Sequence, residues 1–217
     1  MIIYNGCMVT VGQVITEIKT LINYQLWPRM FRSMKAIQIE KTSDGKPAIK
    51  QNYEIYEEVE HDDQFADKQG LLILMMVSLS QAIGRGLEQI IRNSSESLIN
   101  ILVISLGGLI ETIIGMILWS YILYLIGTRV TKGIATPREI WRCSSFARSP
   151  GIFFAVPFIG SYINLWILIT SFVAIKAALD MSSSKTFLTI IISGIPFVII
   201  QGALIQNILM PILGITL

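Results

Sequence analysis

The chain has 217 residues, of which 53% are hydrophobic and 15% are charged, and its formal net charge is +2. Its mean hydropathy of +0.61 indicates an integral membrane protein, whereas two cysteines far apart in sequence indicate neither a disulfide framework nor a cysteine-based metal site. The small net charge identifies no partner by itself, and no nucleic-acid partner is predicted.

Residues 1–69 form a polar N-terminal region that we expect to be cytoplasmic. Apolar residues recur at helical spacing through Val9–Leu26, with Glu17 on the opposite side, and Pro28 ends the run. This spacing predicts an amphipathic helix, which either lies on the inner membrane face or packs on the hairpin that follows it.

After the amphipathic helix, the sequence predicts a hairpin, and an acidic run follows it. The alternation in Ile37–Glu40, the Asp44-Gly45 pair and the apolar residues of Ile49–Ile55 predict a small two-stranded flap. Residues 54–67 are rich in Asp and Glu, which beside a membrane span is typical of a solvated face. His61 lies among them, but the spacing matches no metal-ligand pattern, so no metal or cofactor site is predicted.

Residues 70–217 are expected to form one membrane domain, because four long apolar stretches fill them. Each stretch can cross a bilayer core of about 30 Å, for which roughly 20 helical residues suffice. No ten-residue alternating strands occur, so the predicted class is all-α rather than a barrel. The stretches are Gly70–Ile91, Leu98–Gly127, Pro150–Leu179 and Thr186–Leu213.

The third stretch is too long for one crossing. It contains Pro150, Pro157 and a turn-like Gly160, which favour a break. We therefore expect a short span near Arg148–Ile159 and a fuller one near Ile163–Leu179. The predicted fold is a five-helix transmembrane bundle, preceded by the amphipathic helix and the small β-hairpin.

The distribution of Lys and Arg sets the expected orientation, since these residues are enriched in cytoplasmic loops close to membrane spans. Five of them follow the second span and Lys185 follows the fourth, whereas the predicted outer turns carry only Arg92. We therefore expect a multi-pass protein of the cell membrane with its N-terminus in the cytoplasm and its C-terminus outside.

Charged residues inside the spans are candidate functional residues, because an unpaired charge at mid-span costs about 2.5 kcal/mol or more. Arg85 and Glu88 lie one turn apart on the first span, and Glu111 lies near the middle of the second. The short turn between these spans brings Arg85 to the height of Glu111, so we expect an intramembrane ion pair. Such a pair serves either as a proton or substrate relay or as a packing contact between two helices, with Gly84 and Gly107 at the same seam.

A basic and aromatic patch is expected at the cytoplasmic face. It would attract anionic lipid of the inner leaflet by about 1 kcal/mol per cation near the surface, or dock the acidic surface of a partner protein. Its residues are Arg129, Lys132, Arg138, Trp141, Arg142 and Arg148.

Motifs for catalysis are missing from the sequence. No nucleotide-binding, hydrolase or metalloprotease motif occurs, and the single His leaves no visible base for a nucleophilic Ser or Thr. We therefore expect no catalytic residue and no enzyme activity.

Small residues, prolines and tryptophans recur in a characteristic order through the membrane domain. The segments that carry this order are Trp119–Gly127, Gly133–Ile140, Ala147–Pro150, Pro157–Gly160, Trp166 and Ala174–Ser182, followed by Lys185. The order resembles that of the Yip (Ypt-interacting protein) domain family, five-span proteins of prokaryotes and eukaryotes. The eukaryotic branch acts in vesicle traffic by engaging Rab-type GTPases, but its Asp-Leu-Tyr-Gly-Pro motif is absent here, so the chain looks more like the prokaryotic-type branch.

The resemblance implies a non-enzymatic membrane organiser or adaptor that binds a partner protein, a second copy of itself or the membrane through its cytoplasmic face. Two alternatives remain open. One is a small transporter or channel subunit that uses Arg85 and Glu111, and the other is an accessory subunit of a larger membrane complex.

Overall fold

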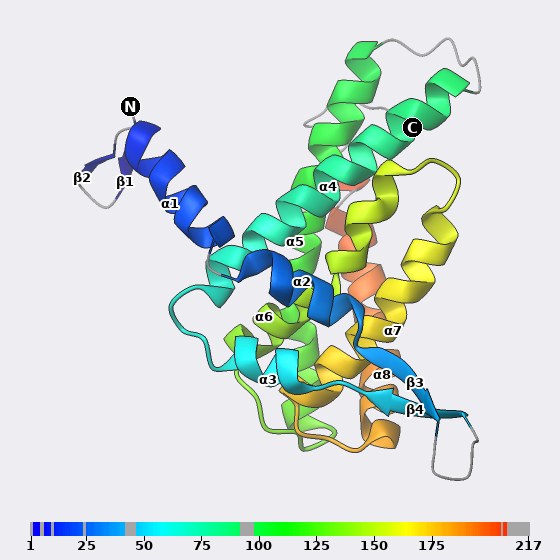
Figure 1. Cartoon of the computed structure of the whole chain (residues 1–217). Helices are drawn as coiled ribbons and strands as arrows, with labels where there is room; N and C mark the ends of the chain where they lie inside the picture. Colours follow the sequence, from blue (N-terminus) through cyan, green and yellow to red (C-terminus); the bar gives the residue numbers. More distant parts are fainter. Residues whose placement is uncertain are drawn as a thin grey trace.

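The structure is a computed structural model that describes residues 2–4, 7–9, 11–23, 25–41, 47–91, 98–204 and 206–207. Among the described residues, four helices are long and apolar enough to cross a membrane, as expected for an integral membrane protein. They pack as an upright bundle (Figure 1). They are α4 (Ala66–Ile91), α5 (Leu98–Arg129), α7 (Gly160–Ala178) and α8 (Ser183–Leu204).

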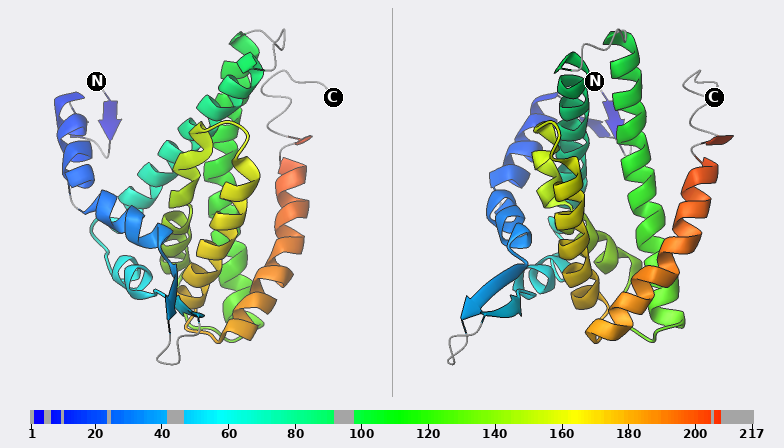
Figure 2. Two further views of the ribbon diagram at one scale, coloured as in Figure 1. Left: turned by 45° about the vertical axis from the view of Figure 1, so that its right-hand side comes forward. Right: turned by 90° about the vertical axis from the view of Figure 1, so that its right-hand side faces the viewer.

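The segment expected to form a short fifth span has a different structure. Between α5 and α7 the chain forms α6 (Pro137–Ala147), followed by η1 (Ser149–Ala155), a 3-10 helix of seven residues. Helix α6 and η1 both pack between α4 and α7, so two short helices follow one another along the bundle here instead of one long helix (Figure 2). Continuous helix is interrupted at Pro150, which lacks a backbone N–H. The five-span count is therefore not confirmed.

Glycines let α4 and η1 approach each other closely. A Cβ on Gly84 would lie 1.9 Å from the backbone oxygen of Phe154, and a Cβ on Gly151 would lie 2.5 Å from Val77 Cγ1. Gly84 therefore faces η1, and not α5 as the sequence suggested. The side chains of residues 98–111, including Gly107, lie outside the described residues.

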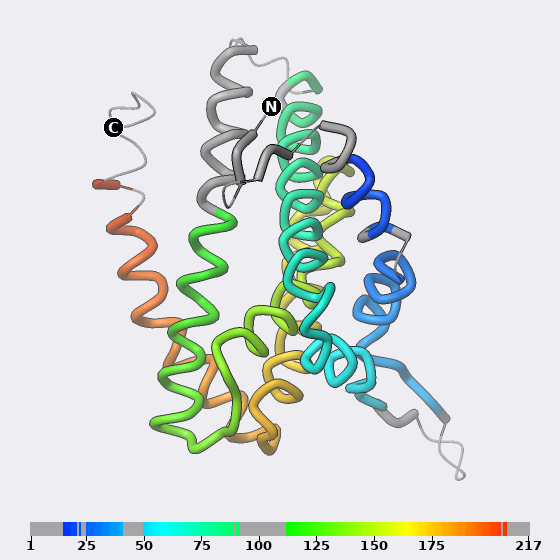
Figure 3. Tube along the Cα trace, turned by 90° about the vertical axis from the view of Figure 1, so that its left-hand side faces the viewer, coloured from blue at the N-terminus to red at the C-terminus, as the bar shows by residue number. Residues whose placement is uncertain are grey.

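Two loops meet at one end of the bundle, which we call the lower end and which is at the bottom of Figure 3. Residues 130–136 join α5 to α6, and residues 179–182 join α7 to α8. Ile134 N donates to Leu179 O at 3.1 Å, and the hydroxyls of Thr131 and Thr189 lie 2.8 Å apart. These bonds hold α5, α7 and α8 together where their chains turn.

The N-terminal region forms short elements along one side of the bundle. The antiparallel strands β3 (Ile37–Lys41) and β4 (Pro47–Gln51) confirm the predicted hairpin, with Ile39 opposite Ile49. Its turn, residues 42–46, lies outside the described residues. The other elements are β1 (Ile2–Tyr4), β2 (Cys7–Val9), α1 (Val11–Asn23), α2 (Leu26–Met34) and α3 (Glu54–Glu60).

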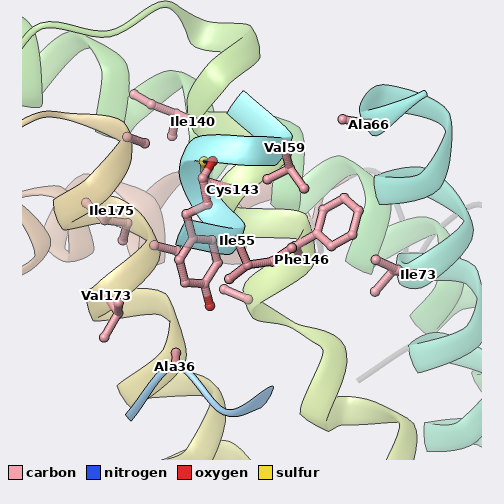
Figure 4. Packing of buried hydrophobic residues seen from close by; sticks show 14 of the residues in the cluster. Ala36, Ile55, Val59, Ala66, Ile73, Ile140, Cys143, Phe146, Val173 and Ile175 are labelled. Carbon is pink, nitrogen blue, oxygen red and sulfur yellow. Dashed lines mark hydrogen bonds between the residues drawn. The ribbon is translucent and has the colours of Figure 1, made fainter. Parts of the chain in front are cut away.

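The N-terminal region and the bundle share one hydrophobic core. Ile55 and Val59 of α3 pack among Cys143 and Phe146 of α6 and Ile175 of α7 (Figure 4). Each large apolar side chain buried in this way contributes about 1.5–3 kcal/mol. The expected domain boundary at residues 69 and 70 falls inside α4, and the core continues across it.

The hairpin is attached to the bundle through Lys176 of α7. Its Nζ donates to Gln51 Oε1 at 3.1 Å and to the Tyr53 hydroxyl at 2.6 Å, and it lies 4.9 Å from the centre of the Tyr53 ring. The cation is therefore bound by residues of the N-terminal region rather than extended toward the membrane surface.

Candidate functional site

Helix α6 brings a buried arginine into contact with the acidic run. The helix begins with a capping box, in which Thr136 Oγ1 accepts from Glu139 N at 3.3 Å and Thr136 N donates to Glu139 Oε2 at 2.7 Å. Only 2% of the Arg142 side chain is exposed, and its Nε donates to Asp67 Oδ1 at 2.8 Å. Its Nη2 donates to Asp63 Oδ1 at 2.7 Å and to Asp67 Oδ2 at 3.2 Å, and Nη1 donates to a backbone oxygen, that of Glu60, at 2.7 Å.

A second buried arginine binds the same run from α2. The Arg29 side chain is 4% exposed, and its Nε donates to Glu58 Oε1 at 2.8 Å. Its Nη1 donates to Asp62 Oδ2 at 2.6 Å and to Gln69 Oε1 at 2.8 Å. Carboxylates of the run therefore join the N-terminal region to the bundle. Glu54, Glu57 and Asp63 are exposed, so the expected solvated face holds for only part of the run.

The charges of this network determine its pKa shifts. Burial opposes the charge of Arg142, but its hydrogen bonds with Asp67 and Asp63 outweigh that effect and raise the pKa of the guanidinium. Burial would likewise raise the pKa of Asp62, but hydrogen bonds from the backbone N–H of Phe65 and from Arg29 lower it overall. Both shifts favour the charged, paired state.

Glu60 behaves differently from these carboxylates. Burial and the nearby Glu139 raise the pKa of Glu60 to about 7. Its carboxylate forms no ion pair among the described residues, and the network uses its backbone oxygen instead.

A groove lies between α4, α5 and α6, and we call it the α6 groove. It has a volume of about 550 Å³ and an apolar wall that includes Leu71, Ile113 and Ile117. Its polar end has Arg138, whose Nε lies 3.2 Å from Asp67 Oδ2, and the half-buried Trp141. The remaining lining residues are Ser120, Tyr121 and Pro137. The α6 groove is apolar with a cation at one end, which suits a ligand that has a hydrocarbon chain and an anionic head.

The predicted basic patch is only partly assembled. Arg129, Lys132 and Arg138 are exposed at the lower end. Arg142 instead is buried against Asp63 and Asp67, which corrects its assignment to an exposed patch. Arg148 lies at the far end of α6 and lines a different cavity. Lipid or partner binding by the exposed cations stays a prediction.

The predicted intramembrane ion pair is not tested, because the side chain of Glu111 lies outside the described residues. No carboxylate of the described residues forms an ion pair with Arg85. Glu88 Oε1 accepts from Phe158 N at 2.7 Å, where the backbone has a φ of 68°. Glu88 therefore stabilises the turn between η1 and α7.

Sequence reasoning missed Arg29, although the sequence contains a signal for it. Arg29 shares a helical face with Leu26, Met30 and Ser33, so it belongs to the apolar side of α2. An arginine on that side needs an acidic partner, and the run that begins at Glu54 is the densest group of acidic residues in the sequence.

No family model, no curated protein and no solved structure matches the chain. Among the residues whose structure is described, no group of three or more His, Cys, Asp or Glu could hold a metal ion.

Proposed function

We propose that the protein is a non-enzymatic membrane organiser or adaptor, of the kind that the Yip resemblance implies, and that it acts through the lower end of its bundle. The proposal places this end and the N-terminus in the cytoplasm, with the segment near Arg148–Ile159, which contains η1, as the fifth crossing and the C-terminus outside. Its anionic partner is a phospholipid of the inner leaflet. A protein partner or a second copy would then use the surface of the N-terminal region beside that lipid.

The observation that carries the proposal is the α6 groove. Its apolar wall can receive an acyl chain, while the exposed Arg138 and the amphipathic ring of Trp141 lie at its polar end. Asp67 is engaged by Arg142 as well as by Arg138, so it neutralises only part of the charge at this end. A cation near the membrane surface attracts anionic lipid by about 1 kcal/mol.

Native mass spectrometry of the detergent-solubilised protein tests the lipid. When anionic and zwitterionic phospholipids are offered together, we expect the protein to retain more of the anionic one. Arg138→Gln should reduce this preference for anionic lipid about fivefold. Lys185→Gln removes an equally exposed charge outside the groove and should leave the preference unchanged. Equal retention of both lipids by the unaltered protein would overturn the lipid proposal.

Cysteine labelling tests the orientation, with Cys7 and Cys143 replaced by Ser. A cysteine at the exposed Thr136 should be protected from a membrane-impermeant reagent in intact cells, whereas one at the exposed Ser161 should react. The reverse pattern would invert the proposed topology.

One observation favours the alternative of a transporter or channel subunit. Two polar cavities share Gln81 and Arg85, and one of them extends toward Asn164 near the upper end of α7. Flux of small anions in proteoliposomes that an Arg85→Gln variant loses while remaining folded would replace the organiser proposal with this one.

A further inference from the structure

A second, more polar cavity lies higher in the bundle than the arginine network. It has a volume of about 280 Å³ and lies between α4, α5, α8 and the junction of α6 with η1. Arg85 is about 28 Å along α4 from its start at Ala66, so the cavity is well above the lower end. Its polar lining residues are Gln81, Arg85, Thr112, Arg148 and Gln201.

The two cations of this cavity differ from the buried arginines at the lower end. No ion pair joins Arg85 or Arg148 to a carboxylate of the described residues, and the described lining of the cavity contains no Asp or Glu. Two guanidinium groups that face one cavity repel each other, and this repulsion is stronger where water is scarce. An anion placed between them would remove that cost.

The other lining groups favour an oxyanion. Guanidinium groups donate several hydrogen bonds in a plane that matches carboxylate and phosphate oxygens, and the amide of Gln81 adds a further donor. A glycine keeps the amide of Gln201 close to α5, because a Cβ on Gly115 would lie 3.1 Å from Gln201 Nε2.

A smaller cavity adjoins this one. A neighbouring cavity of about 170 Å³ shares Gln81 and Arg85 and is also lined by Glu88 and Asn164. Arg85 is the charged group that lines both cavities. Glu88 lines only the smaller cavity, and its carboxylate accepts a hydrogen bond from the backbone N–H of Phe158.

We propose that this cavity binds a phosphate-type oxyanion between Arg85 and Arg148, with Gln81 as an additional donor. The ligand is either free inorganic phosphate or the phosphate of a membrane phospholipid. This site is separate from the α6 groove and does not depend on the proposed function. Its competitor within the chain is Glu111, the residue before Thr112, whose carboxylate would fill the site if it paired with Arg85.

Thermal unfolding of the full-length protein in an uncharged detergent tests the free anion. Inorganic phosphate at ten times its Kd should raise Tm by about 3–6 °C relative to chloride at the same ionic strength. Arg148→Gln and Arg85→Gln should each weaken the apparent Kd by about ten- to a hundredfold, and Arg148→Lys should restore part of the effect. Lys185→Gln, which alters an exposed cation outside the cavity, should respond as the unaltered protein does.

Phosphorus analysis of the purified protein identifies the lipid source. A tightly retained phospholipid that Arg148→Gln loses, together with no response to added phosphate, would assign the site to a lipid headgroup. A phosphate response without retained lipid would assign it to the free anion. Because the α6 groove can retain a phospholipid of its own, the phosphorus content is compared between the unaltered protein and an Arg85→Gln/Arg148→Gln double variant. An equal phosphorus content in both, together with no phosphate response in the unaltered protein, would overturn the proposal. A phosphate response that persists in the double variant would also overturn it, and the comparison of phosphate with chloride requires no variant to fold.

Discussion

The lower end of the bundle and the cavity above it use arginine in opposite ways. Arg29 and Arg142 are buried and are each bound by two carboxylates. Arg85 and Arg148 line a polar cavity and form no ion pair with a described carboxylate. The buried Arg29 and Arg142 need a counter-charge, and the chain itself supplies it. Arg85 is exposed and Arg148 is half-buried, so both can bind a ligand that enters the cavity.

The contrast separates arginines that hold the fold together from arginines that can bind a ligand. Because Arg29 and Arg142 both bind the acidic run, they hold the N-terminal region against the bundle and orient α6. Helix α6 then positions Arg138 in the groove and Arg148 at the cavity. Variants that distinguish these roles are the sharpest tests of the comparison.

The largest effect is expected from Arg142→Ala. Removing this guanidinium leaves Asp63, Asp67 and a backbone oxygen without their donor, which should cost about 3–5 kcal/mol in the free energy of unfolding. Chemical denaturation in detergent micelles measures this loss. Arg129→Ala, at an exposed position, should change it by no more than about 0.5 kcal/mol. Equal effects of the two variants would refute a structural role for the network.

A smaller effect is expected from Gly84→Ala. The new methyl group would meet the backbone oxygen of Phe154 and push α4 away from η1, at a cost of about 1–3 kcal/mol in the same measurement. Gly194→Ala is the matched control, since nothing lies within 4 Å of its added Cβ. That control should be neutral or stabilising by up to about 1 kcal/mol, because alanine favours a helix more than glycine does. A stabilising Gly84→Ala would contradict the close approach of the two helices.

The pH dependence of stability should reveal Glu60. Its pKa is about 7 in the folded chain, against an ordinary value of 4.5, so the folded state binds more protons between these pH values. Stability from this group is therefore present below pH 4.5 and is lost as pH rises toward 7. We expect Tm of Glu60→Gln to fall less than that of the unaltered protein over this range. An equal dependence of Tm on pH in both proteins would show that a group other than Glu60 titrates.

The smallest change in stability is expected from Arg148→Gln in buffer without phosphate. This substitution leaves no described carboxylate without its partner, so the free energy of unfolding should change by less than about 1 kcal/mol or increase slightly. A loss as large as that of Arg142→Ala would mean that Arg148 is bound within the chain, and the contrast between the two regions would disappear.

The sequence pattern within a segment is sufficient to predict the elements whose structure depends on residues close together in the chain. The apolar stretches predict the four long helices because hydropathy and length decide whether a segment can cross a bilayer. Asp44-Gly45 predicts the hairpin because this dipeptide favours a tight turn. Helix α6 could also have been predicted, since Thr136, Pro137 and Glu139 form a recognisable start signal.

Other features could not be read from local pattern. The prolines near Arg148–Ile159 show that a helix breaks there, but only the tertiary structure shows that the segment forms a 3-10 helix packed against Gly84 of α4. The acidic run looks solvated in sequence, because nothing within one helical turn of it carries the matching arginines. These arginines come from α2 and α6, on either side of the run in the chain.

The sequence by itself determined which segments are apolar, where helices and the hairpin start, and how the cations are distributed. Only the tertiary structure decided which charges meet, because Arg29 is 29 residues from Glu58 and Arg142 is 75 residues from Asp67. The physical reason is that desolvation depends on all the elements that surround a side chain. Two arginines with the same intrinsic chemistry thus become a structural contact at Arg142 and part of the wall of a polar cavity at Arg148.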